Sequence, residues 1–328
     1  MKKIIDDKRL IYKCCSLYYN QRMTQEKICK KLGLSRATVS RLLEAGREVG
    51  IVQIQVVNPS DFNYGEMEQQ LEELYGLKDV MIVEEQPLDT TYDRIERLSD
   101  TAFDYLRRRM KSGDFIGVTM GRSLLHITKT KKEYRENRDL LFVPMFGGVS
   151  QKRTGREDVQ SNHIAVEFAK KFGGDYVQFL APAVFSDEKV KKMFLKEDSM
   201  KYIYDYFSKL KIVIMGIGVP NISGTALVTE GYLDEDKLNE FVEKGAVGDA
   251  SLQFYNIDGD TKPFDEFNKR VVGIQREQLC KVETRIGIGG GKKKAKAVIG
   301  AIASKSINVL VTDSECAIEI LNYEKMRT

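Results

Sequence analysis

The sequence contains few of the residues that metal sites, disulfide scaffolds and histidine-dependent catalysis require. Its 328 residues include five cysteines and two histidines, and there is no tryptophan. No two cysteines form a Cys-x-x-Cys pair, which argues against both a disulfide framework and a zinc site. Nothing in the sequence pairs His126 or His163 with a nucleophile. We therefore expect no metal, no cofactor and no catalytic residues.

Long apolar runs are lacking as well. No run approaches the ~20 residues that a membrane-spanning helix needs. The basic residues 1–3 are followed by the charged stretch 6–9, where a signal peptide would have its apolar core. A hydrophobic content of 42% and a charged content of 30% are ordinary for a globular protein. We therefore expect a cytoplasmic protein that makes no membrane contact.

The net charge of +4 conceals an uneven distribution. Residues 1–57 contain 12 Lys and Arg but only 5 Asp and Glu, whereas the remainder contains 40 and 43. A basic N-terminal part joined to a nearly neutral larger part favours binding of nucleic acid by the first part alone.

Residues 24–43 have the pattern of a helix-turn-helix, the motif that inserts its second helix into the major groove of DNA. Thr24 and Ser35 are good N-cap residues for two helices, one over 25–32 and one beginning at Arg36. Gly33 tolerates the positive φ of the sharp turn between them. The apolar residues expected to wedge the helices together are Ile28, Leu32, Leu34, Val39 and Leu42.

The outer side of the second helix would present polar side chains to base edges and phosphates. We expect DNA contacts from Thr24, Gln25, Ser35, Arg36, Thr38, Val39 and Arg41. The alternative is an ordinary helical hairpin with a solvated basic face. The caps, the turn glycine and the apolar wedge together favour double-stranded operator DNA as a partner.

A boundary between two domains is predicted at residues 58–63. Gly50 ends the second helix, and residues 51–57 alternate like a strand. Asn58-Pro59-Ser60 then breaks the pattern. We therefore assign residues 1–57 to a DNA-binding domain, 58–63 to a linker and 64–328 to a large second domain. The helix expected over 64–75 could be a spacer or a dimer contact.

The second domain alternates short apolar runs with longer amphipathic ones, which is typical of a mainly parallel sheet covered by helices on both faces. The expected fold is therefore α/β, with a small helix-turn-helix domain preceding a large, doubly wound domain. Strands are predicted at 80–83, 115–119, 140–145, 176–180, 212–217, 285–288 and 308–312, and helices at 94–110, 123–129, 159–172, 293–304 and 316–321.

Glycine-rich loops follow three of these strands, at 117–123, 144–150 and 287–294. In parallel sheets, ligands bind where such loops meet helix N-termini, and the N–H groups there suit an anion. Each loop alone is a weak signal, because a glycine at a strand end is often only a tight turn. The third loop is not a P-loop, since Ile286 stands where the first glycine should be.

Two polar residues outside these loops are further candidates. Asp249 lies in a glycine-rich bend, where it could accept hydrogen bonds from sugar hydroxyls, act as a general base or satisfy its own turn. Asn162 opens a predicted helix and could donate to a ligand or simply cap the helix.

These motifs, in this order, resemble those of the SorC family of bacterial sugar-responsive transcriptional regulators over nearly the whole chain. The resemblance rests on residues 35–43, 117–118 with 121–124, 143–144 with 147–148, 162–165, 181–182, 215–218, 245–249, 285–292 and 307–313. Relatives often have Gly-Trp where this chain has Thr119-Met120.

The resemblance implies an effector domain related to sugar-phosphate isomerases, a phosphorylated sugar or a sugar as effector, and dimers or tetramers on operator DNA. By this likeness the phosphate lies on the first loop, with Gly147, Gly148 and Lys293 nearby, while Asp249 and Asn162 face the sugar. The effector contacts expected on this basis are Thr119, Gly121, Arg122, Ser123, Gly147, Gly148, Asn162, Asp249, Gln253, Gly290 and Lys293.

Two other functions fit parts of the sequence. A sugar-phosphate isomerase fused to a DNA-binding domain would use Asp249 as its base, but neither histidine offers a matching acid. An architectural DNA-binding protein without a ligand would leave the glycine-rich loops unexplained. A ligand-controlled regulator explains both parts of the chain.

Overall fold

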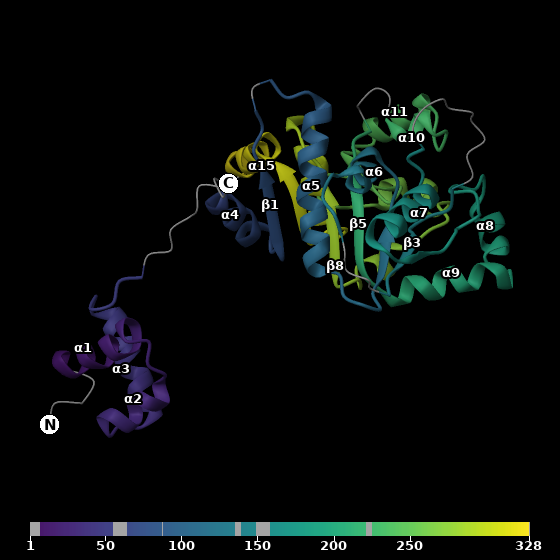
Figure 1. The fold of residues 1–328 in the computed structure, drawn as a ribbon. Coiled ribbons are helices and arrows are strands. Elements are labelled where there is room, and N and C mark those ends of the chain that lie inside the picture. Colours follow the sequence, from purple (N-terminus) through teal and green to yellow (C-terminus); the bar gives the residue numbers. More distant parts are fainter. Residues whose placement is uncertain are drawn as a thin grey trace. The chain divides into compact units, whose positions relative to one another are not determined.

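The computed structural model describes residues 7–54, 64–86, 88–134, 139–148, 158–220 and 225–327 (Figure 1). The chain divides into two compact units, Met1–Phe62 and Asn63–Thr328, each with its own core. Within the described ranges, no helix is both long and apolar enough to cross a membrane. The predicted linker 58–63 lies outside these ranges.

The N-terminal unit is a small helical domain. Its helices are α1 (Lys8–Cys15), which continues as the π-helical turn η2 (Ser16–Asn20), α2 (Gln25–Leu32) and α3 (Arg36–Glu48). Both α1 and α2 pack on α3. Their buried side chains form one hydrophobic cluster made of Ile11, Cys14, Cys15, Leu17, Ile28, Val39, Leu42 and Leu43.

The strand expected at 51–57 is not present over its described part, residues 51–54. The Val52 N–H instead donates to the Gly46 carbonyl (2.9 Å), which folds the chain back onto the end of α3. Ile51 and Val52 pack against the helical core in this turn. Residues 55–57 lie outside the described ranges.

At Gly46, α3 packs tightly against α1. A Cβ atom added there would overlap the Cys15 sulfur and lie 3.3 Å from Ile11 Cγ2. We expect Gly46→Ala to destabilise the N-terminal unit by ~1–3 kcal/mol, because extra volume in a packed core forces side chains to shift. Hydrogen exchange of the α1 and α3 amides would measure the change. Adding Cys15→Ala should restore most of the stability, and a double variant as unstable as the single one would contradict this explanation.

The second unit is built on a mainly parallel sheet, as expected. Its order is β1-β9-β8-β5-β2-β3-β4, with every neighbouring pair parallel. The strands are β1 (Asp79–Val83), β2 (Phe115–Val118), β3 (Leu141–Pro144), β4 (Asp175–Tyr176), β5 (Leu210–Gly218), β8 (Thr284–Ile288) and β9 (Val309–Asp313). An antiparallel hairpin, β6 (Gly248–Ala250) and β7 (Gln253–Tyr255), extends from the end of β5.

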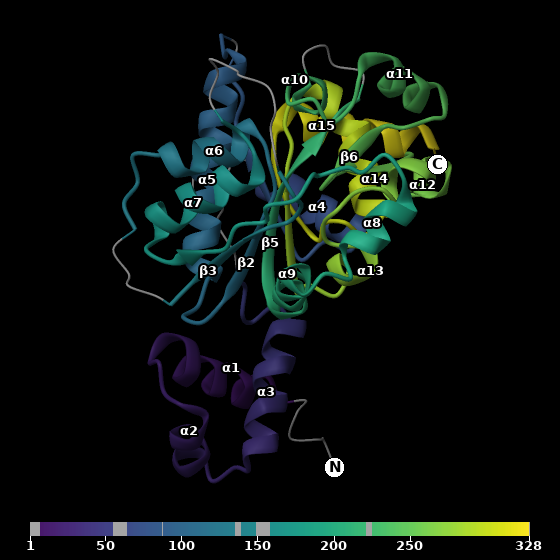
Figure 2. The same cartoon turned by 90° about the vertical axis from the view of Figure 1, so that its right-hand side faces the viewer.

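Helices cover both faces of this sheet (Figure 2). Along β5, Ile212 and Ile214 belong to one hydrophobic cluster, whereas Val213 and Met215 belong to the other. The first face carries α5 (Thr91–Arg109), α6 (Arg122–Lys129) and α7 (Ser161–Phe172), and the second carries α9 (Asp198–Lys209), α14 (Ala295–Ala303) and α15 (Ser314–Arg327). The short helices are α8 (Glu188–Phe194), α10 (Ala226–Thr229), α11 (Glu235–Glu243), α12 (Asp265–Asn268) and α13 (Arg276–Leu279).

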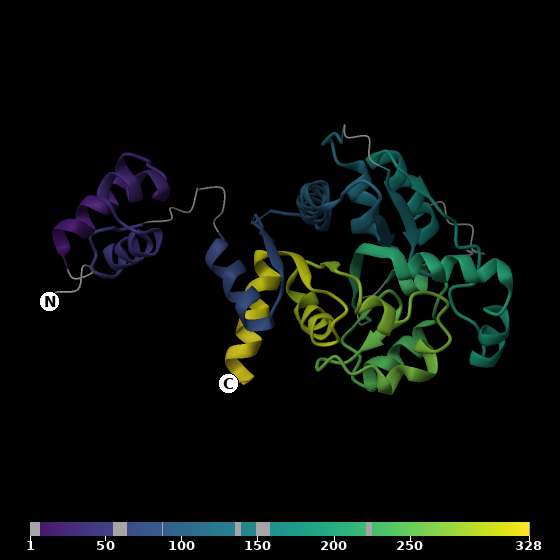
Figure 3. The same ribbon diagram turned by 90° about the horizontal axis from the view of Figure 1, so that it is seen from below.

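The first helix of this unit, α4 (Gly65–Tyr75), packs against β1 and α15 at one edge of the sheet (Figure 3). The outward N–H groups of the edge strand β1 donate to two glutamates of α4. Val80 donates to Glu72 (2.9 Å) and Ile82 donates to Glu68 (2.7 Å). Unpaired edge strands invite pairing with other chains. Here the helix satisfies these N–H groups and closes the edge.

One predicted strand is much shorter than expected. Of residues 176–180, only Tyr176 belongs to β4. The Phe179 N–H, which would continue a ladder, donates instead to the Asn162 side chain (2.7 Å). A side chain from α7 therefore ends the strand.

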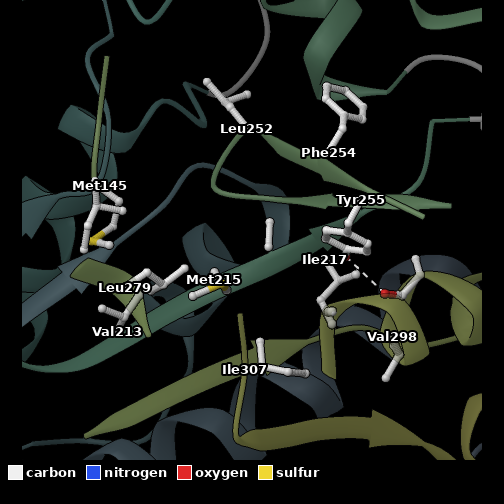
Figure 4. Packing of buried hydrophobic residues seen from close by; sticks show 14 of the residues in the cluster. Met145, Val213, Met215, Ile217, Leu252, Phe254, Tyr255, Leu279, Val298 and Ile307 are labelled. Carbon is white, nitrogen blue, oxygen red and sulfur yellow. Dashed lines mark hydrogen bonds between the residues drawn. The ribbon is translucent and has the colours of Figure 1, made fainter. Parts of the chain in front are cut away.

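The hairpin is held against the sheet by a dense part of the core (Figure 4). Leu252, Phe254 and Tyr255 come from the hairpin, and they lie in the same cluster as Ile217 and Val298. The buried Tyr255 hydroxyl donates to the Ala297 carbonyl on α14 (3.0 Å). This packing fixes the position of Asp249, which belongs to the same hairpin.

Candidate functional sites

The helix-turn-helix forms as the local sequence predicts. Thr24 Oγ1 accepts the Lys27 N–H (3.4 Å) at the start of α2, and Ser35 Oγ accepts the Thr38 N–H (3.2 Å) at the start of α3. Gly33 ends α2 in the left-handed conformation, at φ +67° and ψ +33°. Each helix therefore begins at its expected cap.

The residues expected to contact DNA differ in their exposure. Thr24, Ser35, Arg36 and Arg41 are exposed, while Gln25 and Thr38 are half-buried. Within residues 7–54, neither Arg36 nor Arg41 forms an ion pair, so both guanidinium groups are available to a phosphate or a base.

Val39 does not belong with these residues. Its side chain is fully buried in the cluster that joins α2 to α3, together with Ile28 and Leu42. Its expected role in the wedge is therefore correct, and its expected contact with DNA is not, because a buried side chain cannot reach a groove.

The N-terminal unit also contains a cavity of about 220 Å³ between the η2 turn and residues 51–54. Its lining includes Tyr12, Tyr19 and Ile54, and none of the described residues that line it has a charged side chain. This cavity therefore matches neither the phosphate site nor the sugar site expected from the sequence, which lie in the second unit.

In the second unit, the loop after β2 leads directly into α6. Gly121 adopts φ +136° and its N–H donates to the Val159 carbonyl (3.0 Å), while the Thr119 N–H donates to the Ile214 carbonyl (3.3 Å). These two N–H groups are thus already bonded, and Thr119 is buried. Among the described residues, no side chain caps α6. The N–H groups at its first turn and the Arg122 side chain are the groups of this loop that could hold an anion.

Asp249 in β6 is a buried carboxylate with unused hydrogen-bonding capacity. Its Oδ1 has no hydrogen-bond partner among the described residues. A Cβ atom at Gly218 would overlap this oxygen, so only glycine fits beside it. Burial raises the pKa of the Asp249 carboxyl to about 6, against the opposing effects of the Leu252 N–H and the Lys294 charge.

Lys294 brings a cation to the same place. Its Nζ donates to the Ile217 carbonyl on β5 (2.7 Å), and its charge interacts with those of Asp249 and Arg122. Burial lowers the pKa of the Lys294 ammonium, and the nearby Asp249 opposes this effect. The charges of Arg122 and Asp249, which come from distant parts of the sequence, thus both act on Lys294, and these three residues are a candidate site.

The tip of the hairpin adds two further unpartnered polar atoms. Ser251 Oγ and Gln253 Nε2 are buried and have no partner within the described ranges. Ser251 and Leu252 also have positive φ values, 55° and 61°, which is unusual for residues other than glycine. Strain and unmet hydrogen bonds in one turn are features that concentrate at ligand sites.

The third loop turns a different lysine toward the sheet from the one expected. Lys293 is exposed, whereas Lys294 reaches inward to β5. The Gly289 N–H donates to the Val311 carbonyl (3.1 Å) and the Gly291 N–H to the Asp313 carboxylate (2.6 Å), so neither is free for an anion. The signal for this loop was its lysine cluster, which does not reveal which lysine faces the sheet.

Asn162 and the second loop have structural contacts. The Asn162 amide donates to the Gly148 and Phe179 carbonyls (3.1 Å each) and accepts the Phe179 N–H. A Cβ atom added at Gly147 would lie 2.5 Å from the Ala181 carbonyl oxygen, so no side chain fits there. No hydrogen bond or ion pair joins these residues to Asp249 or Lys294 in the described part of the unit.

We expect Asn162→Ala to lower the free energy of unfolding by ~1–3 kcal/mol, because it leaves the Phe179 N–H without its partner. Urea unfolding of the full chain, followed by circular dichroism, would measure the loss. His163→Ala at the next position is the control and should change stability by less than ~1 kcal/mol. An Asn162→Ala variant as stable as wild type would contradict the structural role.

Comparison with known proteins shows which family the chain is related to. The family model described as "Putative sugar-binding domain" matches residues 62–322. The chain is 30% identical to the sorbitol operon regulator of Klebsiella pneumoniae, over 95% of this chain and 97% of that protein. It is 28% identical to the deoxyribonucleoside regulator of Bacillus subtilis, over 97% and 98%.

Solved structures of similar proteins share the fold of this chain. The full-length sorbitol operon regulator SorC from Klebsiella pneumoniae superposes with a TM-score of 0.71 at 29% identity, covering 96% of this chain and 99% of that one. A probable sor operon regulator from Shigella flexneri gives a TM-score of 0.68 at 26% identity, covering 78% and 98%. These relatives are transcriptional regulators and not enzymes.

Proposed function

Because the chain belongs to the SorC family of sugar-responsive transcriptional regulators, we propose that its second unit binds a phosphorylated sugar at Arg122, Asp249 and Lys294. Binding there controls how the helix-turn-helix of the first unit engages operator DNA. The domains are those drawn from the sequence: DNA-binding over 1–57, a linker over 58–63, and effector binding and oligomerisation over 64–328.

The observation that carries this proposal is that two cationic side chains occur together with buried polar atoms that have no hydrogen-bond partner among the described residues. Arg122 and Lys294 suit a dianionic phosphate at the uncapped start of α6. Asp249 Oδ1 is an acceptor and Gln253 Nε2 a donor, as sugar hydroxyls require. An unpartnered buried polar atom costs ~1–3 kcal/mol, so a ligand that supplies the missing partners removes this cost when it binds.

On the DNA side, α3 enters the major groove and presents Arg36 and Arg41, with Ser35 and Thr38 at its start. A homodimer places two such helices on half-sites about one helical turn apart, and a tetramer extends the same arrangement. Effector binding changes DNA affinity by a coupling free energy on the order of 1–3 kcal/mol.

Thermal unfolding of the full chain against chosen sugars tests the effector proposal. The probes are sorbitol, sorbitol 6-phosphate, 2-deoxyribose and 2-deoxyribose 5-phosphate. A ligand at about 100 times its dissociation constant adds roughly 2.7 kcal/mol of stability. We expect stabilisation by a phosphorylated probe only. If the unphosphorylated sugars stabilise and the phosphorylated ones do not, the phosphate assignment is wrong.

Two neighbouring lysines provide a matched pair of variants. Lys294→Gln should abolish stabilisation by the phosphorylated probe, since it removes the cation that faces Asp249. Lys293→Gln removes an exposed charge of the same loop and should leave the stabilisation unchanged. Equal losses in both variants would mean that the loop acts only through its overall charge.

A further inference from the structure

Arg94 on α5 is the centre of a cluster of ionic contacts that lies next to the third glycine-rich loop, residues 287–294. Its Nε lies 3.0 Å from Asp313 Oδ2 at the end of β9, and its Nη2 lies 3.2 Å from Glu315 Oε2 on α15. The same Nη2 also bonds Glu85, which follows β1. One guanidinium group thus joins three segments, and it is mostly buried.

Asp313 connects this cluster to the loop. Its Oδ2 accepts the Gly291 N–H (2.6 Å) and its Oδ1 accepts the Cys316 N–H (2.9 Å), while its side chain is only 1% exposed. A Cβ atom at Gly290 would overlap Asp313 Oδ2, and one at Gly291 would lie 2.7 Å from Arg94 Nη1. The carboxylate therefore lies against the backbone of both glycines, and the guanidinium lies against Gly291.

The loop in turn sets the position of Lys294. The Gly291 carbonyl accepts the Lys294 N–H (2.9 Å), which closes the turn that begins η4 (Lys292–Lys294). From there the Lys294 side chain reaches the Ile217 carbonyl. An unbroken series of contacts thus runs from Arg94 through Asp313 and Gly291 to Lys294.

We infer that Arg94 is a positioning residue, which through Asp313 holds the 289–294 loop in the conformation that presents Lys294 to the effector. The effect of Arg94 on effector binding rests on the proposed function, whereas its effect on the conformation of the loop does not. Without Arg94, Asp313 would be a buried carboxylate with no ion-pair partner among the described residues, which is a costly arrangement that the loop can relieve by opening toward water.

The same helix supplies a matched control. Arg97 forms an ion pair with Asp89, and its side chain is 32% exposed compared with 22% for Arg94. Asp89 belongs to the turn before α5, where its carboxylate accepts the Gln86 N–H. Arg97→Gln therefore removes a similar cation from α5 without touching Asp313 or Gly291.

The first measurement is hydrogen exchange of the ligand-free full chain. Arg94→Gln should speed exchange of the 289–294 amides at least tenfold, while Arg97→Gln leaves them within twofold of wild type. Peptides from β2 and α7 report whether the rest of the unit remains folded. If Arg94→Gln unfolds the second unit, the exchange experiment is repeated with Arg94→Lys and Asp313→Asn, since each of these removes only part of the cluster. Unchanged exchange of the loop in all three variants would overturn the inference.

The second measurement is affinity for 2-deoxyribose 5-phosphate and for inorganic phosphate. Arg94→Gln should weaken binding about tenfold and Arg97→Gln should not. A loosened loop with unchanged affinity would overturn the role in effector binding. If the wild-type chain binds neither probe, the proposed phosphate site fails, and the exchange experiment still decides whether Arg94 holds the loop.

Discussion

The double substitution Arg36→Ala, Arg41→Ala should weaken binding to a cognate DNA duplex by ~2–6 kcal/mol. Each arginine is exposed on α3 and forms no ion pair within residues 7–54. Loss of one base-reading arginine typically costs ~1–3 kcal/mol, and the two positions lie on different turns of the helix, so their effects should nearly add. Caps and core remain intact, because neither side chain belongs to the buried cluster.

The measurement is fluorescence anisotropy with a duplex that the wild-type chain selects from a random library. An unrelated duplex of equal length reports non-specific binding, which should fall much less. Arg47→Ala, near the end of the same helix, is the control for loss of charge alone. If Arg47→Ala weakens the cognate complex as much as the double substitution, α3 does not read bases through its first half.

The helix-turn-helix was predictable because its signals are local. The hydroxyls of Thr24 and Ser35 each act within three residues, and Gly33 is needed for its own φ. The central strands were predictable for a related reason. A parallel strand buried on both faces is a continuous apolar run, as 212–217 is, and the sequence pattern needs no knowledge of the strand's neighbours.

The early end of β4 was missed because it depends on a contact between residues that are distant in sequence. Nothing near Phe179 in sequence shows that Asn162 will take its N–H and end β4. The β6–β7 turn was missed because Ser251 and Leu252 adopt positive φ without glycine, so the usual hairpin signal is absent. Leu252 in this turn is only 1% exposed, so its packing in the core helps to hold the turn.

The candidate effector site was found only in part, because some of its residues are positioned by contacts between distant parts of the sequence. Asp249, Gln253 and Arg122 stand beside or near glycines in the sequence, and that signal located them. Lys294 could not be separated from Lys293, since the choice depends on how the 3₁₀ turn is rotated against β5. Arg94 and Asp313 are more than 200 residues apart, and no local pattern relates them.

Replacing Asp249 with asparagine should stabilise the ligand-free chain at neutral pH and abolish its response to a phosphorylated sugar. The carboxyl is buried, and burial raises its pKa from 3.8 to about 6. A raised pKa means that the folded state binds this proton more tightly than the unfolded chain does. Ionising the group therefore costs folding stability, and a shift of this size corresponds to about 3 kcal/mol.

The direction of the Asp249 pKa shift determines the pH range in which wild type and Asp249→Asn differ in stability. Below about pH 4 the carboxyl is protonated in both states, so wild type and Asp249→Asn should be similarly stable. As the pH rises from there through about 6, wild type should lose stability relative to the variant, and above that range the difference should be constant. Urea unfolding of the full chain at several pH values measures this difference. Asp205→Asn, at an exposed position of α9, is the control and should track wild type throughout.

A gain in stability combined with a loss of ligand response would separate a binding residue from a structural one. A carboxylate kept for the fold would destabilise the chain when neutralised, because its hydrogen bonds and ion pairs would weaken. Asp249 has an oxygen without a partner among the described residues, beside a lysine whose own charge is unfavourable there. If Asp249→Asn is less stable than wild type at pH 8, then this carboxylate supports the fold, and the effector site has to be sought elsewhere in the unit.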